Sequence, residues 1–234
     1  MPSWNVNVAG VWKTVIAPAV NVAGTWHNVV SGWVNVAGTW ELFFAAFTGP
    51  VIHTFTAVGG FTETIPLGSS NLVIEVWGAC GGGDHGIGTG CAIDVGATGA
   101  SGSYCRTSVS VVGHGNQTIA GLIGTGGAGG LVAGTGAGNG TASTVSSGTF
   151  TLGSMTAPGG GGAKDPTGGA AGATGSGGTA ANSPGKAGHN SSIGGGGPGV
   201  VGINGTGSDG GASALGASHP GNPGAAGKVI FYYT

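Results

Sequence analysis

Charged side chains are scarce in this chain. Its 234 residues include 5 Lys and Arg and 7 Asp and Glu, which gives a formal net charge of −2. Nucleic-acid affinity depends on clusters of basic side chains that neutralise phosphates. The basic residues are scattered along the sequence, so we do not expect nucleic-acid binding. They are Lys13, Arg106, Lys164, Lys186 and Lys228.

Long apolar runs are also missing. No run approaches the roughly 20 residues that a helix needs to cross a bilayer, so membrane insertion is not expected. The first seven residues have neither a basic nor an apolar region of the kind found in signal peptides, and none is predicted. Cys80, Cys91 and Cys105 form no Cys-x-x-Cys pair, which argues against a zinc site. We predict buried free thiols, with one disulfide and a leftover thiol as the alternative.

The sequence contains no convincing catalytic constellation. Asp84-His85 is the one acidic residue next to a histidine, and adjacent residues of an extended chain point in opposite directions. The acidic residues form no pair suited to glycoside hydrolysis, and no glycine stretch has the Gly-Lys-Ser/Thr of a phosphate loop. We therefore predict a protein that is not an enzyme, without cofactor or metal. The six histidines are His27, His53, His85, His114, His189 and His219.

Glycine is the abundant residue, with 58 copies, far above the usual ~7%. Disordered chains combine low hydrophobicity with high charge, and this chain is 39% hydrophobic and 5% charged. Two apolar β-forming runs, 71–77 and 228–233, bracket the glycine-rich region, which indicates ordered glycine loops on a β scaffold. Glycines recur at every third position in patches such as 121–130 and 169–178. That is the period of the polyproline-II helix, although a third of the region being glycine produces such runs by chance, so packed helices of this type remain open.

Further β-forming segments predict an all-β, sandwich-like domain over residues 48–234, with seven or eight strands. Gly49-Pro50 marks its beginning. Segments 53–57 and 61–65 alternate around a turn at 58–60. No segment has helical periodicity. The remaining expected strands are 104–112, 117–123 and 142–155, the last broken at 146–148.

A 14-residue repeat occupies residues 1–47. Val6-Asn7-Val8-Ala9-Gly10-Val11-Trp12 recurs at 20–26 and again at 34–40. Each copy predicts a β-hairpin, because apolar and polar residues alternate and Ala-Gly supplies a tight turn. An isolated hairpin is marginal in water, so we expect the repeats to mediate assembly; a three-hairpin meander is the alternative. Candidate assembly residues are Trp12, Trp26, Trp33, Trp40, Phe43 and Phe44.

Residues 53–234 resemble the glycine-rich domain of bacteriophage tail-fibre and host-recognition (adhesin) proteins. The resemblance is carried by Ile65–Gly68, Leu72–Gly83, Gly102–Val112, Ala157–Gly162 and Gly227–Tyr233. The repeats at 1–47 are similar to short β repeats that precede such domains in phage tail proteins. Cys80 and Asp84-His85 depart from the longer pure glycine stretch of the family.

The resemblance implies a homotrimeric virion structural protein of the tail fibre or tail tip, made in the host cytoplasm. Its partners would be other tail proteins and a host surface glycan or outer-membrane protein. Two alternatives remain: a purely structural attachment subunit without receptor binding, and an ice- or surface-binding glycine-rich protein, which would need a flat face of regularly spaced Thr or Ala.

Polar residues that interrupt the glycine loops are the candidate receptor-binding residues, because recognition residues concentrate on loops held by a rigid scaffold. Taken singly, each of them is better explained as a solvated spacer, and the hypothesis of receptor binding concerns the group. The set is Asp84, His85, Lys164, Asp165, His189, Asn190, Asn204, Asp209, His219 and Asn222.

Overall fold

A computed structural model describes most of the chain, and the described part is all-β, as predicted. Among the described residues there is no helix long and apolar enough to cross a membrane. The described residues are 5–8, 11–14, 19–22, 24–28, 31–45, 47, 49–86, 88–89, 92–131, 135–164, 167–190, 192–193 and 220–234.

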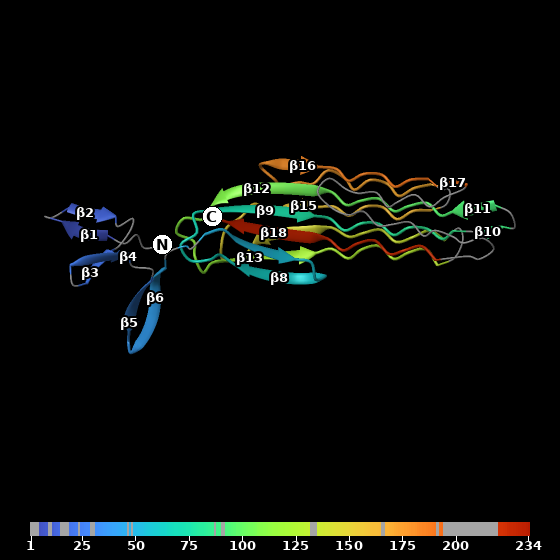
Figure 1. The fold of residues 1–234 in the computed structure, drawn as a ribbon. Coiled ribbons are helices and arrows are strands. Elements are labelled where there is room, and N and C mark those ends of the chain that lie inside the picture. The colour runs from blue at the N-terminus through green and yellow to red at the C-terminus, as the bar shows by residue number, and fades with distance from the viewer. Residues whose placement is uncertain are drawn as a thin grey trace.

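A five-stranded antiparallel sheet forms one layer of the main domain, in the order β16-β12-β9-β18-β7 (Figure 1). The two runs that bracket the glycine-rich region pair at its centre, with Ile74 opposite Phe231. Chain segments more than 150 positions apart are therefore joined directly. The strands are β7 (Val51–Phe55), β9 (Asn71–Trp77), β12 (Tyr104–Ser110), β16 (Ala181–Ser183) and β18 (Lys228–Tyr233).

A four-stranded antiparallel sheet forms the second layer, in the order β15-β14-β13-β8. The segments around the turn at 58–60 do not pair with each other: β7 joins the first sheet and β8 the second. The stacked rings of Phe55 and Phe61, with centroids 4.3 Å apart, fill the space where the chain crosses between the layers. The strands of this sheet are β8 (Gly59–Thr64), β13 (Thr118–Ile123), β14 (Ser143–Ser147) and β15 (Met155–Ala157).

The hydrophobic core lies between the two sheets. Every second residue of β9 and β18 is buried, as the alternation of a half-buried strand requires. Leu72 and Phe231 meet Ile119 and Val145 of the opposite sheet in one buried cluster. Each such side chain contributes about 1.5–3 kcal/mol when it leaves water, so this cluster is the main source of stability of the domain.

The N-terminal repeat forms three β-hairpins, as predicted. In the third, Ala37 and Gly38 both have positive φ, 51° and 92°, which is the type I′ turn that suits the twist of a hairpin. Trp40 of this hairpin is 66% exposed. Within the described residues, each hairpin is a two-stranded sheet that pairs with no other strand. The strands are β1 (Asn5–Val8), β2 (Val11–Thr14), β3 (Ala19–Val22), β4 (Thr25–Asn28), β5 (Ser31–Val36) and β6 (Thr39–Ala45).

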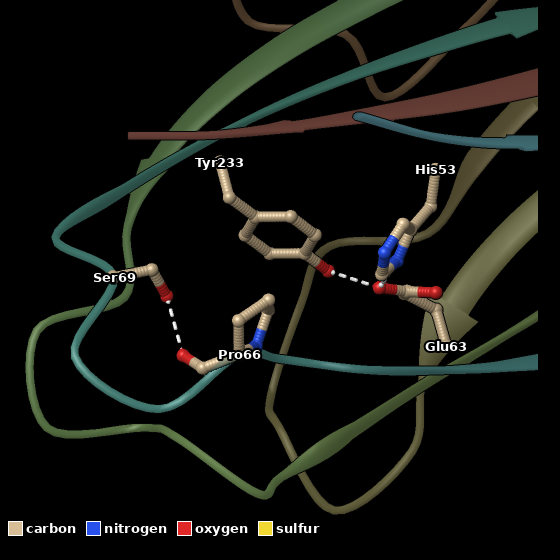
Figure 2. Close-up of polar contacts among 5 residues, drawn as sticks. All are labelled: His53, Glu63, Pro66, Ser69 and Tyr233. Carbon is tan, nitrogen blue, oxygen red and sulfur yellow. Dashed lines mark hydrogen bonds and ion pairs between the residues drawn. The ribbon is translucent and has the colours of Figure 1, made fainter. Parts of the chain in front are cut away.

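A buried carboxylate ties the two sheets together at one end of the sandwich (Figure 2). Glu63 of β8 is 4% exposed. Its Oε1 accepts a hydrogen bond from the Tyr233 hydroxyl of β18 at 2.9 Å and lies 2.8 Å from Nδ1 of His53 of β7. A buried carboxylate without such partners would be strongly destabilising, so the three side chains fix the relative position of the sheets.

Burial, and then the negative charge of Glu63 and the hydrogen bond to it, raise the pKa of Tyr233 well above the tyrosine range. Burial likewise raises the pKa of Cys105 to about 11. Each group keeps its proton in the folded state at a pH where the unfolded chain releases it. The stability that they contribute is therefore complete below the unfolded pKa and is lost as pH rises above it.

We expect the melting temperature to fall progressively above about pH 10, where an unfolded tyrosine ionises. Tyr233→Phe should cost about 1–3 kcal/mol at pH 7, because Glu63 loses a partner, but should make the alkaline decline less steep. Thermal melts between pH 7 and 11 measure both effects. Tyr232→Phe is the comparison on the same strand: burial and then a hydrogen bond to Glu75 also raise the pKa of Tyr232, but its side chain is only half-buried, so we expect a smaller change in the alkaline slope. Identical alkaline slopes for Tyr233→Phe and the parent protein would contradict the assignment.

Candidate functional site

Beyond Trp77 the chain leaves the sheet and continues as an extended segment whose backbone bonds to several neighbours in turn. Successive N–H groups donate to three different segments, and the cycle then repeats. The donors and acceptors are Ala79 to Thr141 O, Cys80 to Ala225 O, Gly81 to Ala100 O, Gly82 to Gly138 O, Gly83 to Asn222 O and Asp84 to Ala97 O.

This pattern identifies the segment as an extended helix with three residues per turn. Residues three apart bond to the same neighbour, and the acceptor number falls by three as the donor number rises by three. These three neighbours therefore run antiparallel to the segment. The period and the absence of helix-internal bonds are those of polyproline-II-type helices packed side by side. Glycine segments bonded in this way, whose structure the sequence left open, therefore adopt this arrangement in the part of the chain that the structure describes.

Two further neighbours run parallel to the same segment. Gly160 N and Ala163 N donate to the carbonyls of residues 79 and 82, and Gly127 N and Gly130 N to those of 80 and 83. Figure 1 shows these segments side by side, continuing beyond the sheets. We call them the glycine bundle, which comprises residues 78–86, 96–103, 124–131, 135–142, 158–164, 167–175, 184–190 and 220–227.

The bundle depends on glycine because its segments approach too closely for a side chain. A Cβ atom on Gly99 would lie 2.1 Å from the carbonyl oxygen of Gly81, and one on Gly102 would lie 2.2 Å from that of Gly78. Other inward positions hold small residues such as Ala97 and Ala100, which are fully buried. Buried backbone groups must be hydrogen-bonded, and the close approach provides those bonds.

The sandwich sets the register of the bundle. Gly78 N donates to Ser103 O at 2.9 Å, which continues the pairing of β9 with β12 past the end of the sheet. Gly227 N similarly donates to Gly124 O at 3.0 Å where β13 and β18 adjoin the bundle. Because glycine loses more entropy on ordering than other residues, this alignment by paired strands helps the bundle to form.

Asp84 and His85 do not occupy a loop tip. They are 0% and 7% exposed, because they lie on the central segment of the bundle and the Asp84 N–H takes part in its bonding. The Asp84 carboxylate accepts a hydrogen bond from the His85 backbone N–H at 2.7 Å. Their assignment to an exposed receptor-binding loop was therefore wrong. His85 Nδ1 is buried without a hydrogen-bond partner.

Four other candidates are exposed, and the bonding register places them near the end of the bundle remote from the sandwich. Asn222 O accepts from Gly83 N, and His189 O from Thr98 N. Asn190 Oδ1 accepts from Gly168 N at 2.9 Å, and Lys164 exchanges two backbone bonds with Thr167. A small sheet of β10 (Gly88–Thr89), β11 (Ala92–Val95) and β17 (Ser192–Ile193) lies at the same end (Figure 1).

The remaining candidates are only partly covered by the structure. Asp165, Asn204, Asp209 and His219 lie outside the described residues. Among the assembly candidates, the backbones of Trp12, Trp26, Trp33, Phe43 and Phe44 lie in hairpin strands, and their side chains are likewise outside the description.

Sequence reasoning missed a polar and aromatic cluster on the outer face of the five-stranded sheet. Glu75 Oε1 accepts a hydrogen bond from the Tyr104 hydroxyl at 2.7 Å and lies 3.6 Å from Arg106 Nε. Lys228 Nζ lies 4.1 Å from the centroid of the Trp77 ring. Burial, followed by the hydrogen bond to Glu75, raises the pKa of Tyr104. The alternation of 71–77 already implied that Glu75 and Trp77 share the outer face, but not which residues of other strands lie beside them.

Within the described residues, no group of three or more His, Cys, Asp or Glu side chains is placed to hold a metal ion. The chain matches no family model and no curated protein.

We expect Gly99→Ala to destabilise the protein by at least about 2 kcal/mol, because overpacking of an ordered interior costs roughly 1–3 kcal/mol or more. The neighbour that the new methyl group meets is the backbone of Gly81 and Gly82, which cannot move aside as the end of a flexible side chain can. Gly153→Ala is the control, since a Cβ there meets nothing within 4 Å. Urea denaturation measures both variants. Equal midpoints for the two would contradict the close approach of segments 78–84 and 96–103.

Proposed function

We propose that this protein is a structural component of a bacteriophage virion, located in the tail fibre or tail tip, whose glycine bundle contacts the host cell surface. It acts by binding and not by catalysis. The observation that carries the proposal is the register that places four exposed polar residues near the remote end of one hydrogen-bonded bundle. The resemblance of residues 53–234 to phage glycine-rich adhesin domains supports the same function.

The construction of the bundle suits this role. Inward positions admit only glycine or small side chains, as Gly99 and Ala100 illustrate. Outward positions have no such restriction, and Lys164 and His189 occupy two of them. A binding surface held by backbone hydrogen bonds is pre-organised, so less conformational entropy is lost when a host molecule binds.

The direct test is binding of the purified protein to a panel of intact bacterial cells, measured by fluorescence after labelling. We expect binding to at least one host and a loss of about tenfold or more, equivalent to 1.4 kcal/mol, when Lys164, His189 and Asn222 are replaced together by alanine. Asn190 is left unchanged, because its side chain also caps Gly168. The matched control is Thr62→Ala, an exposed change on β8 of the sandwich.

Two results would contradict the proposal. Undiminished binding by the triple variant would mean that the remote end of the glycine bundle does not contact the host cell. Incorporation into virions without binding to any cell would favour the purely structural attachment subunit.

A further inference from the structure

The two sides of the sandwich differ in the length of their edge strands and in whether other parts of the chain cover the open backbone groups of those strands. On one side the edge strands are β16 and β15, each three residues long. The chain covers part of this side: Thr156 of β15 exchanges two backbone hydrogen bonds with Ser176, and the carbonyl of Ser183 of β16 accepts one from Gly175 N. The short strands and these bonds limit the length of open backbone on this side.

The opposite side is formed by β7 and β8, which are five and six residues long. They are joined only by residues 56–58, so both edges lie on the same side. Within the described residues, β7 pairs with β18 alone. Its sequence, Val51 to Phe55, contains no Lys, Arg, Asp, Glu or proline. Natural edge strands are usually kept from pairing by charge, proline, a bulge or short length, and β7 has none of these.

The pairing of β9, β18 and β7 determines which backbone groups of β7 point away from the sheet. Asn71 and Thr234 exchange both of their backbone hydrogen bonds, so the polar groups of Thr234 face β9. Because successive residues of an antiparallel strand face opposite sides, those of Tyr233 face β7 and bond to Val51. The N–H and C=O groups of Ile52 and Thr54 therefore face away from the sheet. Ile52 is also 59% exposed.

The same chain contains strands that have no partner beyond their own hairpin. The third hairpin is the longest, with β6 spanning seven residues, whereas the strands of the first two have four. It is long enough to cover the five residues of β7. Two-stranded hairpins are marginally stable by themselves, so an added sheet would stabilise this one.

The connection between β6 and β7 would be short enough for β7 to pair with the hairpin of its own chain, but the two strands do not pair. Only residues 46–50 separate β6 from β7, a loop length at which neighbouring strands commonly pair. The two strands are nevertheless not paired. Gly49, with φ of 101°, and Pro50 lie in this connection.

We propose that the β7 edge is an assembly site that accepts β6 of a second copy of this chain, so that the five-stranded sheet continues across the interface. The contact joins two different surfaces of the chain, the β7 edge and β6. Contacts of this kind form a closed ring when the rotation that relates successive copies adds up to a full turn. A ring of three would agree with the trimer that the resemblance implies. The proposal does not depend on host binding, which concerns the other end of the glycine bundle.

Thr54→Pro tests the site, because it removes an outward N–H and leaves the bonds of Val51, His53 and Phe55 to β18 intact. Thr54→Val is the matched control, since it keeps the N–H. Size exclusion with light scattering gives the oligomeric state of the full chain and of residues 47–234, which contain the whole hydrophobic core. We expect the parent and Thr54→Val to assemble, and Thr54→Pro and the 47–234 fragment to be monomeric.

Hydrogen exchange at the Ile52 amide provides a second readout, because it reports on the β7 edge directly and not on the rest of the fold. We expect exchange about tenfold or more slower in the parent than in Thr54→Pro or the fragment, because a hydrogen bond to a docked strand protects the amide. Circular dichroism and thermal melting confirm that Thr54→Pro is folded.

Three outcomes would overturn the proposal. Assembly of Thr54→Pro equal to that of the parent would exclude the β7 edge. Assembly of the 47–234 fragment that Thr54→Pro abolishes would mean that the edge pairs with a second β7 and not with a hairpin. A monomeric full chain with a protected Ile52 amide would mean that β6 pairs within its own chain. Loss of host binding with assembly intact would affect only the proposed function.

Discussion

The close approach of extended backbones in the glycine bundle is the constraint on which the rest of the structure depends. Each inner segment bonds to several neighbours at once, which requires separations that leave no room for a Cβ at positions such as Gly99. This excludes bulky residues from the inner positions of the bundle and explains the abundance of glycine there. A charged side chain on an inner position would be both too large and buried without a counter-charge. Asp84 is tolerated because its carboxylate accepts a backbone hydrogen bond.

The sandwich solves a problem that the bundle cannot solve alone. Extended glycine segments bury little apolar surface, and ordering them is costly in entropy. The strands that flank them bury Ile74, Val76 and Phe231 completely and hold the bundle segments in register. The bond between Gly78 and Ser103 is the point where sheet pairing becomes bundle pairing. The two parts are thus stabilised differently: hydrophobic burial stabilises the sandwich, and dense backbone hydrogen bonding stabilises the glycine bundle.

The sequence predicted local features well and relationships between distant segments poorly. The strands at 71–77 and 228–233 and the turns of the hairpins were predictable, because alternation and Ala-Gly turns are read within a few residues. The separation of β7 and β8 into different sheets was not, since a turn at 58–60 is compatible with a hairpin as well as with a crossing. Asp84 and His85 were misplaced because a polar residue among glycines has the same appearance in an exposed loop and in a buried segment. The local sequence does not distinguish an exposed loop from a buried segment. Only the neighbouring residues at 97, 130 and 222, which are distant in the sequence, show that this segment is buried.

The bundle also separates the residues that define the fold from those available for recognition. A change at an inward glycine disturbs the backbone of a neighbouring segment, whereas a change at an exposed position such as His189 or Asn222 alters only the side chain presented to solvent. Their backbone bonds, to Thr98 and Gly83, do not depend on side-chain identity. On the proposed function, a surface of this kind would change its specificity by single substitutions without loss of stability. With few charges on the chain, such specificity would come from shape and hydrogen bonding, and binding through it should depend little on salt.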